Sequence, residues 1–230
     1  MSNLPLIECL YNQYKKDTGL QLFIEAISAY TGFPINSTVD ILVGKKVQEM
    51  TISRMRSFFD ELNSGEIVLD KSIIEDNDFL HSYFSVLNYA VRAKSDEKSK
   101  RFAKIIKKLY NNKINTNEFE DYTAIFNELS DREFIILCIK FSFEIEIKKS
   151  SPTFEDYDPI DPYPKTNSYW NKFVSEVDKT LGIDENELSN ILMRIQRTGC
   201  YKIHFGHYIG KESIGDTTIL FQKIYEIVKY

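Results

Sequence analysis

One cysteine and two histidines stand close together near the C-terminus, where they raise the question of metal binding. Cys200, His204 and His207 form the pattern C-x3-H-x2-H. A structural zinc site needs four convergent ligands, whereas residues 204 and 207 of an extended strand project to opposite faces. No fourth ligand lies nearby in the sequence. We therefore expect no metal at these residues.

Two groups of carboxylates also have spacings that invite a chemical role. Asp156, Asp158 and Asp161 resemble calcium ligands, but the mid-loop glycine and the closing glutamate of a calcium loop are absent. A solvated acidic loop is the better interpretation. Glu144 and Glu146 are two carboxylates close in sequence, and that spacing is too common to assign either of them an acid or base role.

The remaining inventory of catalytic residue types is thin. His81 follows an apolar pair on a helical segment, which favours a packed or edge histidine over a general base. The sequence contains no G-x-S-x-G, no P-loop glycine pattern and no G-x-G-x-x-G. No nucleophile, base and orienting residue can be combined from it. We expect that the chain is not an enzyme and that it uses no cofactor.

Positive charge is concentrated between Arg92 and Lys113. This segment holds nine basic and two acidic residues, a net charge of +7 in a chain whose net charge is −5. Like charges four residues apart on a helix repel each other, so the cluster favours contact with phosphate or an acidic partner. The alternative, which is the more common outcome for charged helices, is a solvated face balanced by acidic neighbours. The candidate contact residues here are Lys98, Lys100, Arg101, Lys104, Lys107 and Lys108.

The last fifty residues follow the element order of a winged-helix module. A helix over 169–181 ends at Gly182, and Asp184 caps a second helix over 184–198. Alternating apolar residues predict a strand from Tyr201, with a return strand around 217–219. A final helix closes the chain, and Gly206, Gly210 and Gly215 permit tight turning between the strands.

The charges of this module decide between two kinds of partner. In a DNA-binding winged helix, the second helix would enter the major groove. Here that helix begins with Asp184, Glu185 and Glu187, which repel phosphate, and only Arg194 and Arg197 are candidates for backbone contacts. We therefore favour a non-enzymatic interaction protein that binds a protein partner or associates with itself. The alternative is a winged-helix DNA-binding transcriptional regulator.

Helical periodicity dominates the chain upstream of this module. Ser95 predicts an N-cap, and Ser130 with Glu133 has the form of a capping box. The stretch 141–147 alternates like a strand, so the end of its helix stays open between the two structures. Residues 150–168 predict an irregular, acidic, proline-rich loop. The predicted helices cover about 38–62, 78–92, 96–110, 118–129 and a segment that starts at 131.

These elements predict a mainly α protein, with a helical region over 1–115 and a winged-helix-like domain with a small β-hairpin over 116–230. Its 230 residues are 43% hydrophobic, which is enough to form a packed core. Three widely spaced cysteines fit a reducing compartment. No secretory signal and no apolar segment of membrane-spanning length is evident. A cytoplasmic location is the expectation.

Two helical segments carry a resemblance to a known family. Residues 79–91 predict an apolar helix. Residues 95–106 contain a polar turn followed by a helix with the stretch Phe102-Ala103-Lys104-Ile105-Ile106, which is apolar except for Lys104. Together with the helix start at 129–133 and the winged end, they resemble the central helices of Abi-alpha-type abortive-infection proteins over about residues 75–230. The glycine-rich apolar N-terminal region of that family is only faintly present. The resemblance implies a small bacterial or mobile-element protein tied to phage defence. It offers no catalytic motif to match.

Overall fold

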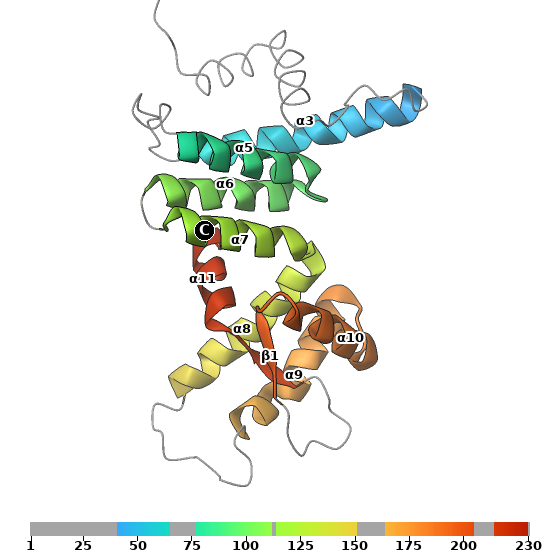
Figure 1. Ribbon diagram of the computed structural model, residues 1–230. Helices are drawn as coiled ribbons and strands as arrows, with labels where there is room; N and C mark the ends of the chain where they lie inside the picture. Colours follow the sequence, from blue (N-terminus) through green and yellow to red (C-terminus); the bar gives the residue numbers. More distant parts are fainter. Residues whose placement is uncertain (1–40, 65–76, 112–113, 151–163, 205–213, 230) are drawn as a thin grey trace, which may run out of the picture. The chain divides into compact units, whose positions relative to one another are not determined.

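The computed structural model describes residues 41–64, 77–111, 114–150, 164–204 and 214–229. In these residues it contains eight α-helices and one two-stranded antiparallel hairpin (Figure 1), which confirms the predicted mainly α class. The chain divides into two compact units, residues 1–124 and 125–230. None of the described helices combines the length and the apolar character that a membrane span requires.

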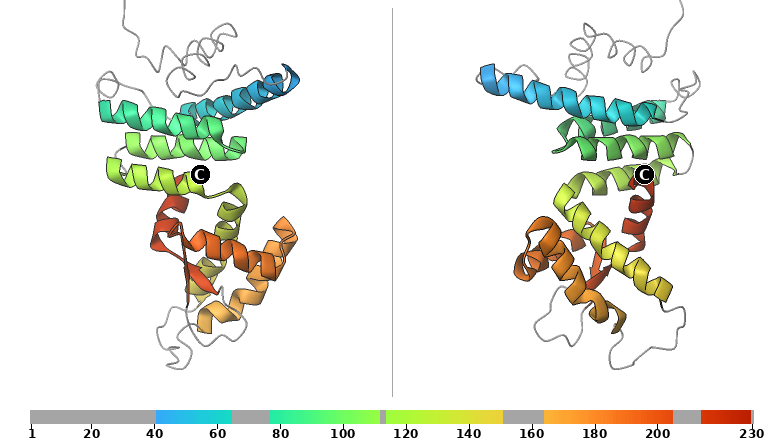
Figure 2. Two further views of the ribbon diagram at one scale, coloured as in Figure 1. Left: turned by 45° about the vertical axis from the view of Figure 1, so that its right-hand side comes forward. Right: turned by 180° about the vertical axis from the view of Figure 1, so that it is seen from behind.

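The N-terminal unit is built on three helices that lie side by side (Figure 2): α3 (Ile41–Asn63), α5 (Asn77–Arg92) and α6 (Asp96–Tyr110). Their apolar faces meet in a buried core that includes Phe58, Tyr83 and Phe102. The predicted cap of α6 is confirmed, because the Ser95 side chain accepts a hydrogen bond of 3.1 Å from the Lys98 N–H. Helix α7 (Thr116–Glu128) follows and carries the chain across the boundary between the units.

The C-terminal unit contains the rest of the described elements, in the order expected of a winged-helix-like module. Helix α8 (Asp131–Ser150) is followed by α9 (Pro164–Leu181) and α10 (Glu185–Gln196). Strands β1 (Tyr201–Ile203) and β2 (Gly215–Thr217) then pair antiparallel, with Lys202 opposite Asp216. Helix α11 (Ile219–Val228) completes the unit.

Aromatic side chains form the centre of the C-terminal core. The ring of Phe221 on α11 lies 5.9 Å from that of Phe134 and 6.0 Å from that of Phe141, both on α8. Phe126, at the end of α7, packs edge-on against Phe134. The apolar stripe of α10 is buried as its spacing predicted, and consists of Leu188, Ile191, Leu192 and Ile195.

Local capping signals predicted most of the helix boundaries correctly. Ser130 and Glu133 exchange both hydrogen bonds of a capping box, at 3.2 and 2.7 Å. Asp184 caps α10 by accepting from the Glu187 N–H at 2.8 Å. Gly182 follows α9 with a φ of 64°, a left-handed conformation that suits glycine.

Two predicted boundaries differ from the structure, and one stretch that the sequence left undecided is now assigned. The predicted loop over 150–168 is helical at Ser150 and again from Pro164, because proline is well tolerated in the first turn of a helix. Residues 151–163 lie outside the described part. The return strand occupies 215–217 rather than 217–219, since Thr218 instead caps α11. The ambiguous stretch 141–147 is entirely helical.

Candidate functional site

The basic residues predicted on α6 do not all face solvent. Lys98 is buried. The Lys107 ammonium lies 2.8 Å from the Glu61 carboxylate of α3 and donates to the Ser64 hydroxyl at 2.8 Å. These two lysines therefore belong to the packing between α6 and α3 and are poorly placed to contact a phosphate.

The other basic residues of α6 are partly exposed. Glu97, in the first turn of the helix, lies 3.8 Å from Lys100 and 3.7 Å from Arg101. Such exposed pairs contribute at most about 1 kcal/mol each, but they reduce the positive field near the start of the helix. Lys104 and Lys108 lie further along the same helix and are half-buried. The compensation expected for a solvated face thus applies to Lys100, Arg101 and Lys107.

Arg194 and Arg197, the two arginines predicted to contact a nucleic-acid backbone, have different surroundings. The Nε of Arg194 lies 2.6 Å from Glu133, the same carboxylate that closes the capping box of α8. Arg197 is exposed at the C-terminal end of α10. A second pair, Arg132 with Glu187, also joins the start of α8 to α10. These pairs connect α10 to α8 and engage the charge of Arg194.

The pKa of Glu133 shows the effect of these contacts. Burial alone would raise it, but hydrogen bonds from Ser130 and Arg194, together with the arginine charge, outweigh burial and hold the pKa of Glu133 below its usual range. A carboxylate with a lowered pKa stabilises the fold above its ordinary pKa of about 4.3, and this stabilisation is lost as the pH falls through the lower folded value.

Replacing Glu133 with glutamine should therefore cost about 1 kcal/mol at pH 7, because the capping hydrogen bond and the charge pair both weaken. The difference from the wild type should shrink as the pH falls below about 4.3. Urea unfolding at a series of pH values measures both quantities. Glu128→Gln, which changes an exposed carboxylate just before α8, is the control. A Glu133→Gln cost that stays constant down to pH 3 would contradict the assignment.

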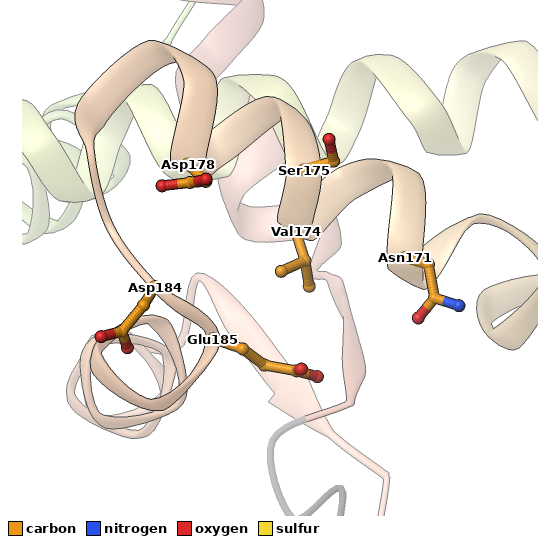
Figure 3. A pocket seen from close by; sticks show the side chains of 6 residues that line it. All are labelled: Asn171, Val174, Ser175, Asp178, Asp184 and Glu185. Carbon is orange, nitrogen blue, oxygen red and sulfur yellow. The ribbon is translucent and has the colours of Figure 1, made fainter.

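A pocket of about 410 Å³ opens between α9 and α10 (Figure 3). Three of its six lining side chains are carboxylates: Asp178 of α9, Asp184 and Glu185. Glu185 accepts a hydrogen bond from the indole N–H of Trp170 at 3.2 Å, and Asp184 is occupied as the cap of α10. Among the described residues, none of the three carboxylates forms an ion pair with a lysine, arginine or histidine. The remaining lining residues are Asn171, Val174 and Ser175.

A buried polar cluster lies deeper in the same unit, around Lys140 of α8. The side chain of Lys140 is fully buried, and its Nζ lies 3.3 Å from Glu144 and 3.3 Å from Asp216 of β2. It also donates to the hydroxyl of Tyr169 on α9 and lies 4.2 Å from the centre of that ring. The Tyr169 hydroxyl in turn donates to Asp216 at 3.1 Å. One ammonium therefore joins α8, α9 and β2; we name these residues, with Thr217 and His204, the Lys140 cluster.

Two further contacts connect the Lys140 cluster to the hairpin. Glu144 accepts the backbone N–H of Thr217 at 2.9 Å and also the Thr217 hydroxyl. His204, directly after β1, lies with its Nε2 2.8 Å from the second oxygen of Asp216. Strand β2 is thereby held to α8 through side-chain hydrogen bonds and an ion pair, and His204 joins the end of β1 to the same Asp216.

Burial dominates the electrostatics of the Lys140 cluster. Burial lowers the pKa of Lys140 even though Glu144 and Asp216 act in the opposite direction. Burial also raises the pKa of Glu144, against the pull of Lys140 and the hydrogen bonds from Thr217. The pKa of Tyr201, on β1 beside the cluster, lies well above its usual value because of burial and the nearby negative charges.

The side chains of the Lys140 cluster are of types used in acid–base chemistry, but solvent hardly reaches them. Lys140 and His204 are 0% and 6% exposed, and only Asp216, at 37%, opens to solvent. A substrate would have no access to the ammonium in this conformation, so the geometry describes an internal connection between elements. Within the described residues, no group of three or more metal-ligating side chains is suited to a metal ion.

The other candidate residues from the sequence have the following positions. Cys200 is buried and His204 pairs with Asp216, while His207 lies outside the described residues, as do Asp156, Asp158 and Asp161. His81 is exposed on α5 rather than packed. Glu144 and Glu146, which the sequence could not distinguish, differ sharply, because Glu144 is buried and Glu146 is exposed.

The sequence pattern missed the Lys140 cluster, although a signal was present. Lys140 is the one charged residue between Phe134 and Phe143, in an otherwise mostly apolar run, and a glutamate follows four residues later. A lone lysine in such a run, with a carboxylate one helical turn away, indicates a buried ion pair. Its partners Tyr169 and Asp216 are 29 and 76 residues away in sequence, and no local pattern connects them to it.

Comparisons with models of protein families, with curated proteins and with solved structures give no significant match to this chain.

Proposed function

We propose that this chain is a non-enzymatic interaction protein whose C-terminal unit binds a basic protein partner through the pocket between α9 and α10. The observation that carries the proposal is the set of three carboxylates, Asp178, Asp184 and Glu185, which line an open pocket without an ion pair to any described lysine, arginine or histidine. Carboxylates gathered in one concave place favour lysine or arginine side chains of a partner.

The charges at the start of α10 also argue against DNA binding at the pocket between α9 and α10. The start of α10, which would meet base edges in a DNA-binding winged helix, carries Asp184, Glu185 and Glu187. Arg194, the nearest candidate for a phosphate contact, is held by Glu133 at 2.6 Å. Releasing that arginine would cost the capping box of α8 one of its charge-assisted contacts.

The test uses a fluorescently labelled lysine-rich peptide as a probe for the basic partner. The wild-type chain should bind it, with an affinity that falls as salt is raised. The double variant Asp178→Asn, Glu185→Gln should bind about tenfold more weakly, because it removes two carboxylates from the pocket while glutamine keeps an acceptor for Trp170. Fluorescence anisotropy at 50 and 300 mM salt measures both effects.

The matched control is Glu176→Gln on the same helix. Glu176 lies 3.8 Å from Lys179, so its charge is already compensated and its loss should leave peptide binding nearly unchanged. A loss in Glu176→Gln equal to the loss per removed charge in the double variant would show that binding follows net charge rather than the pocket. If the wild-type chain does not bind the peptide at low salt, the proposal fails.

DNA binding remains the alternative, favoured by the order of α9, α10, the hairpin and α11. A duplex offered in the same assay distinguishes the two. Reversal of charge at Lys104 and Lys108 should abolish duplex binding if α6 contacts phosphate, and binding should weaken steeply with salt. Lys98 is left unchanged, because it is buried and its replacement would perturb packing.

Phage defence is the biological setting that we propose from the resemblance to Abi-alpha-type abortive-infection proteins. The pocket variant and its control can also test this setting. A host that expresses the wild-type chain should show reduced plating of some phages, and the double variant Asp178→Asn, Glu185→Gln should lose that reduction if the pocket holds the relevant partner. Glu176→Gln should retain it.

A further inference from the structure

Lys140 places a primary amine inside the protein, where only groups of the same chain can react with it. Its side chain is 0% exposed, and its Nζ lies 3.3 Å from an oxygen of Glu144 and 3.3 Å from an oxygen of Asp216. A lysine amine is a nucleophile in its unprotonated form. Burial lowers the pKa of Lys140 and thereby favours that form. A carboxyl group held against such an amine is a potential partner for amide formation.

Asp216 has surroundings that suit the carboxyl group under attack. Its Oδ1, the oxygen beside Lys140, accepts a hydrogen bond of 3.1 Å from the Tyr169 hydroxyl. Its Oδ2 lies 2.8 Å from the Nε2 of His204, which donates when that nitrogen carries its proton. Donors on both oxygens stabilise the negative charge that develops when a nucleophile adds to the carbon. The Asp216 side chain is 37% exposed, so a released water molecule has a path to solvent.

Glu144 is placed to move protons between the two reacting groups. One of its oxygens lies 3.3 Å from the Nζ of Lys140 and also accepts the Thr217 N–H at 2.9 Å, while the other accepts the Thr217 hydroxyl. The carboxylate is therefore fixed beside the amine, at a distance typical of an acid or base in a resting site. Burial raises the pKa of Glu144, which suits a group that accepts a proton and then returns it.

We propose that Lys140 and Asp216 condense into an intramolecular amide bond that covalently joins α8 to β2. The bond from Nζ to the carboxyl carbon forms, and one carbon–oxygen bond of Asp216 breaks. The ammonium starts with three protons and the amide nitrogen keeps one. The other two pass, through Glu144 and the donors on Asp216, to the departing oxygen, which leaves as water. The two opposite charges cancel, nothing is oxidised or reduced, and no outside reactant is needed.

The bond depends on the fold, because Lys140 and Asp216 are 76 residues apart in sequence. Packing of α8 against β2 holds them in contact, and such proximity can replace a large part of the barrier of a bimolecular reaction. The structure describes the unreacted ion pair, from which the bond forms once in each folded chain. A covalent link that closes so long a loop restricts the unfolded chain, so the bonded form should unfold at a higher temperature. The reaction does not depend on the pocket between α9 and α10.

Mass spectrometry of the denatured full-length chain tests the bond directly, after purification and during a week of incubation at neutral pH. A growing fraction should lose the mass of one water molecule. Peptide mapping of that fraction should show the peptide that contains Lys140 joined to the peptide that contains Asp216. The same chain held unfolded in urea should gain no bond, because the reacting groups are then apart. A folded wild-type chain whose two peptides stay separate throughout would overturn the proposal, whatever the variants do.

Variants identify the reacting groups. Lys140→Arg keeps a positive charge but lacks a nucleophilic amine, and should form no bond. Glu144→Gln should react about a hundredfold more slowly, the usual contribution of a positioned acid or base. Glu146→Gln, which changes an exposed carboxylate on the same helix, should react like the wild type. Loss of water that persists undiminished in Lys140→Arg would indicate a cyclic imide at an aspartate and would refute the amide bond.

Discussion

Replacing Lys140 with methionine is expected to lower the free energy of unfolding by about 3–5 kcal/mol, because removal of one partner from a buried ion pair leaves the other charge uncompensated. Glu144, which is buried beside it, would lose its only described counter-charge. Asp216 is about a third exposed and can be hydrated in part, so most of the cost should arise at Glu144. Guanidinium unfolding at pH 7, followed by far-UV circular dichroism, measures the change.

The double variant Lys140→Met, Glu144→Gln shows whether charge is the cause. It should recover a large part of the lost stability, since a buried pair replaced by neutral groups of similar volume is often tolerated. The coupling free energy between the two sites should then be on the order of 1–3 kcal/mol. Lys172→Met, at an exposed position of α9, controls for the substitution itself. A double variant that is less stable than Lys140→Met would contradict the charge explanation.

Gly215→Ala is expected to destabilise the C-terminal unit by about 3 kcal/mol, the upper part of the usual range for overpacking. Gly215 pairs with Ile203 across the hairpin. A Cβ atom at Gly215 would lie 2.8 Å from the Cα of Ile203 and closer still to the carbonyl oxygen of Lys202. Both obstacles are backbone atoms, so rotation of a side chain cannot relieve them. The strands would have to separate, and thermal unfolding would report the loss.

Gly182→Ala provides the comparison for this prediction. Gly182 has a φ of 64°, but nothing lies within 4 Å of the position of an added Cβ. Its replacement should therefore cost only the conformational penalty of a left-handed alanine, about 1–2 kcal/mol. Gly215 has no positive φ, so a cost for Gly215→Ala no larger than that for Gly182→Ala would contradict the explanation by close approach of the strands. The structure predicts the opposite order.

Gly215 illustrates how a correct sequence signal can have a different physical cause. Its residue type indicated a turn between the strands, and we expected the return strand two residues later. In the structure Gly215 begins β2, where the neighbouring strand leaves no room for a side chain. Glycine is required for space in this position, and spacing along the chain cannot distinguish that need from a need for a turn.

Some features of the candidate sites could be predicted from the sequence, and others depend on how the helices pack. The charges at the start of α10 and the cap at Asp184 are properties of a few consecutive residues, so the sequence predicted them and the argument against phosphate that follows from them. That Lys107 is bonded to Glu61 and that Lys98 is buried depends on how α6 packs on α3. The sequence indicated only that basic residues are concentrated along this helix.

The sequence by itself determined the helical class, most of the helix ends, and the order of two helices, a hairpin and a final helix at the C-terminus. These features depend on hydrogen bonds and apolar spacing within about one or two helical turns. Only the tertiary structure decided which charges are buried together. Lys140, Tyr169 and Asp216 come from three elements, and their interaction exists only once α8, α9 and the hairpin pack. Ion pairs and pKa shifts depend on distance in space and on exclusion of water, and neither is encoded in local spacing.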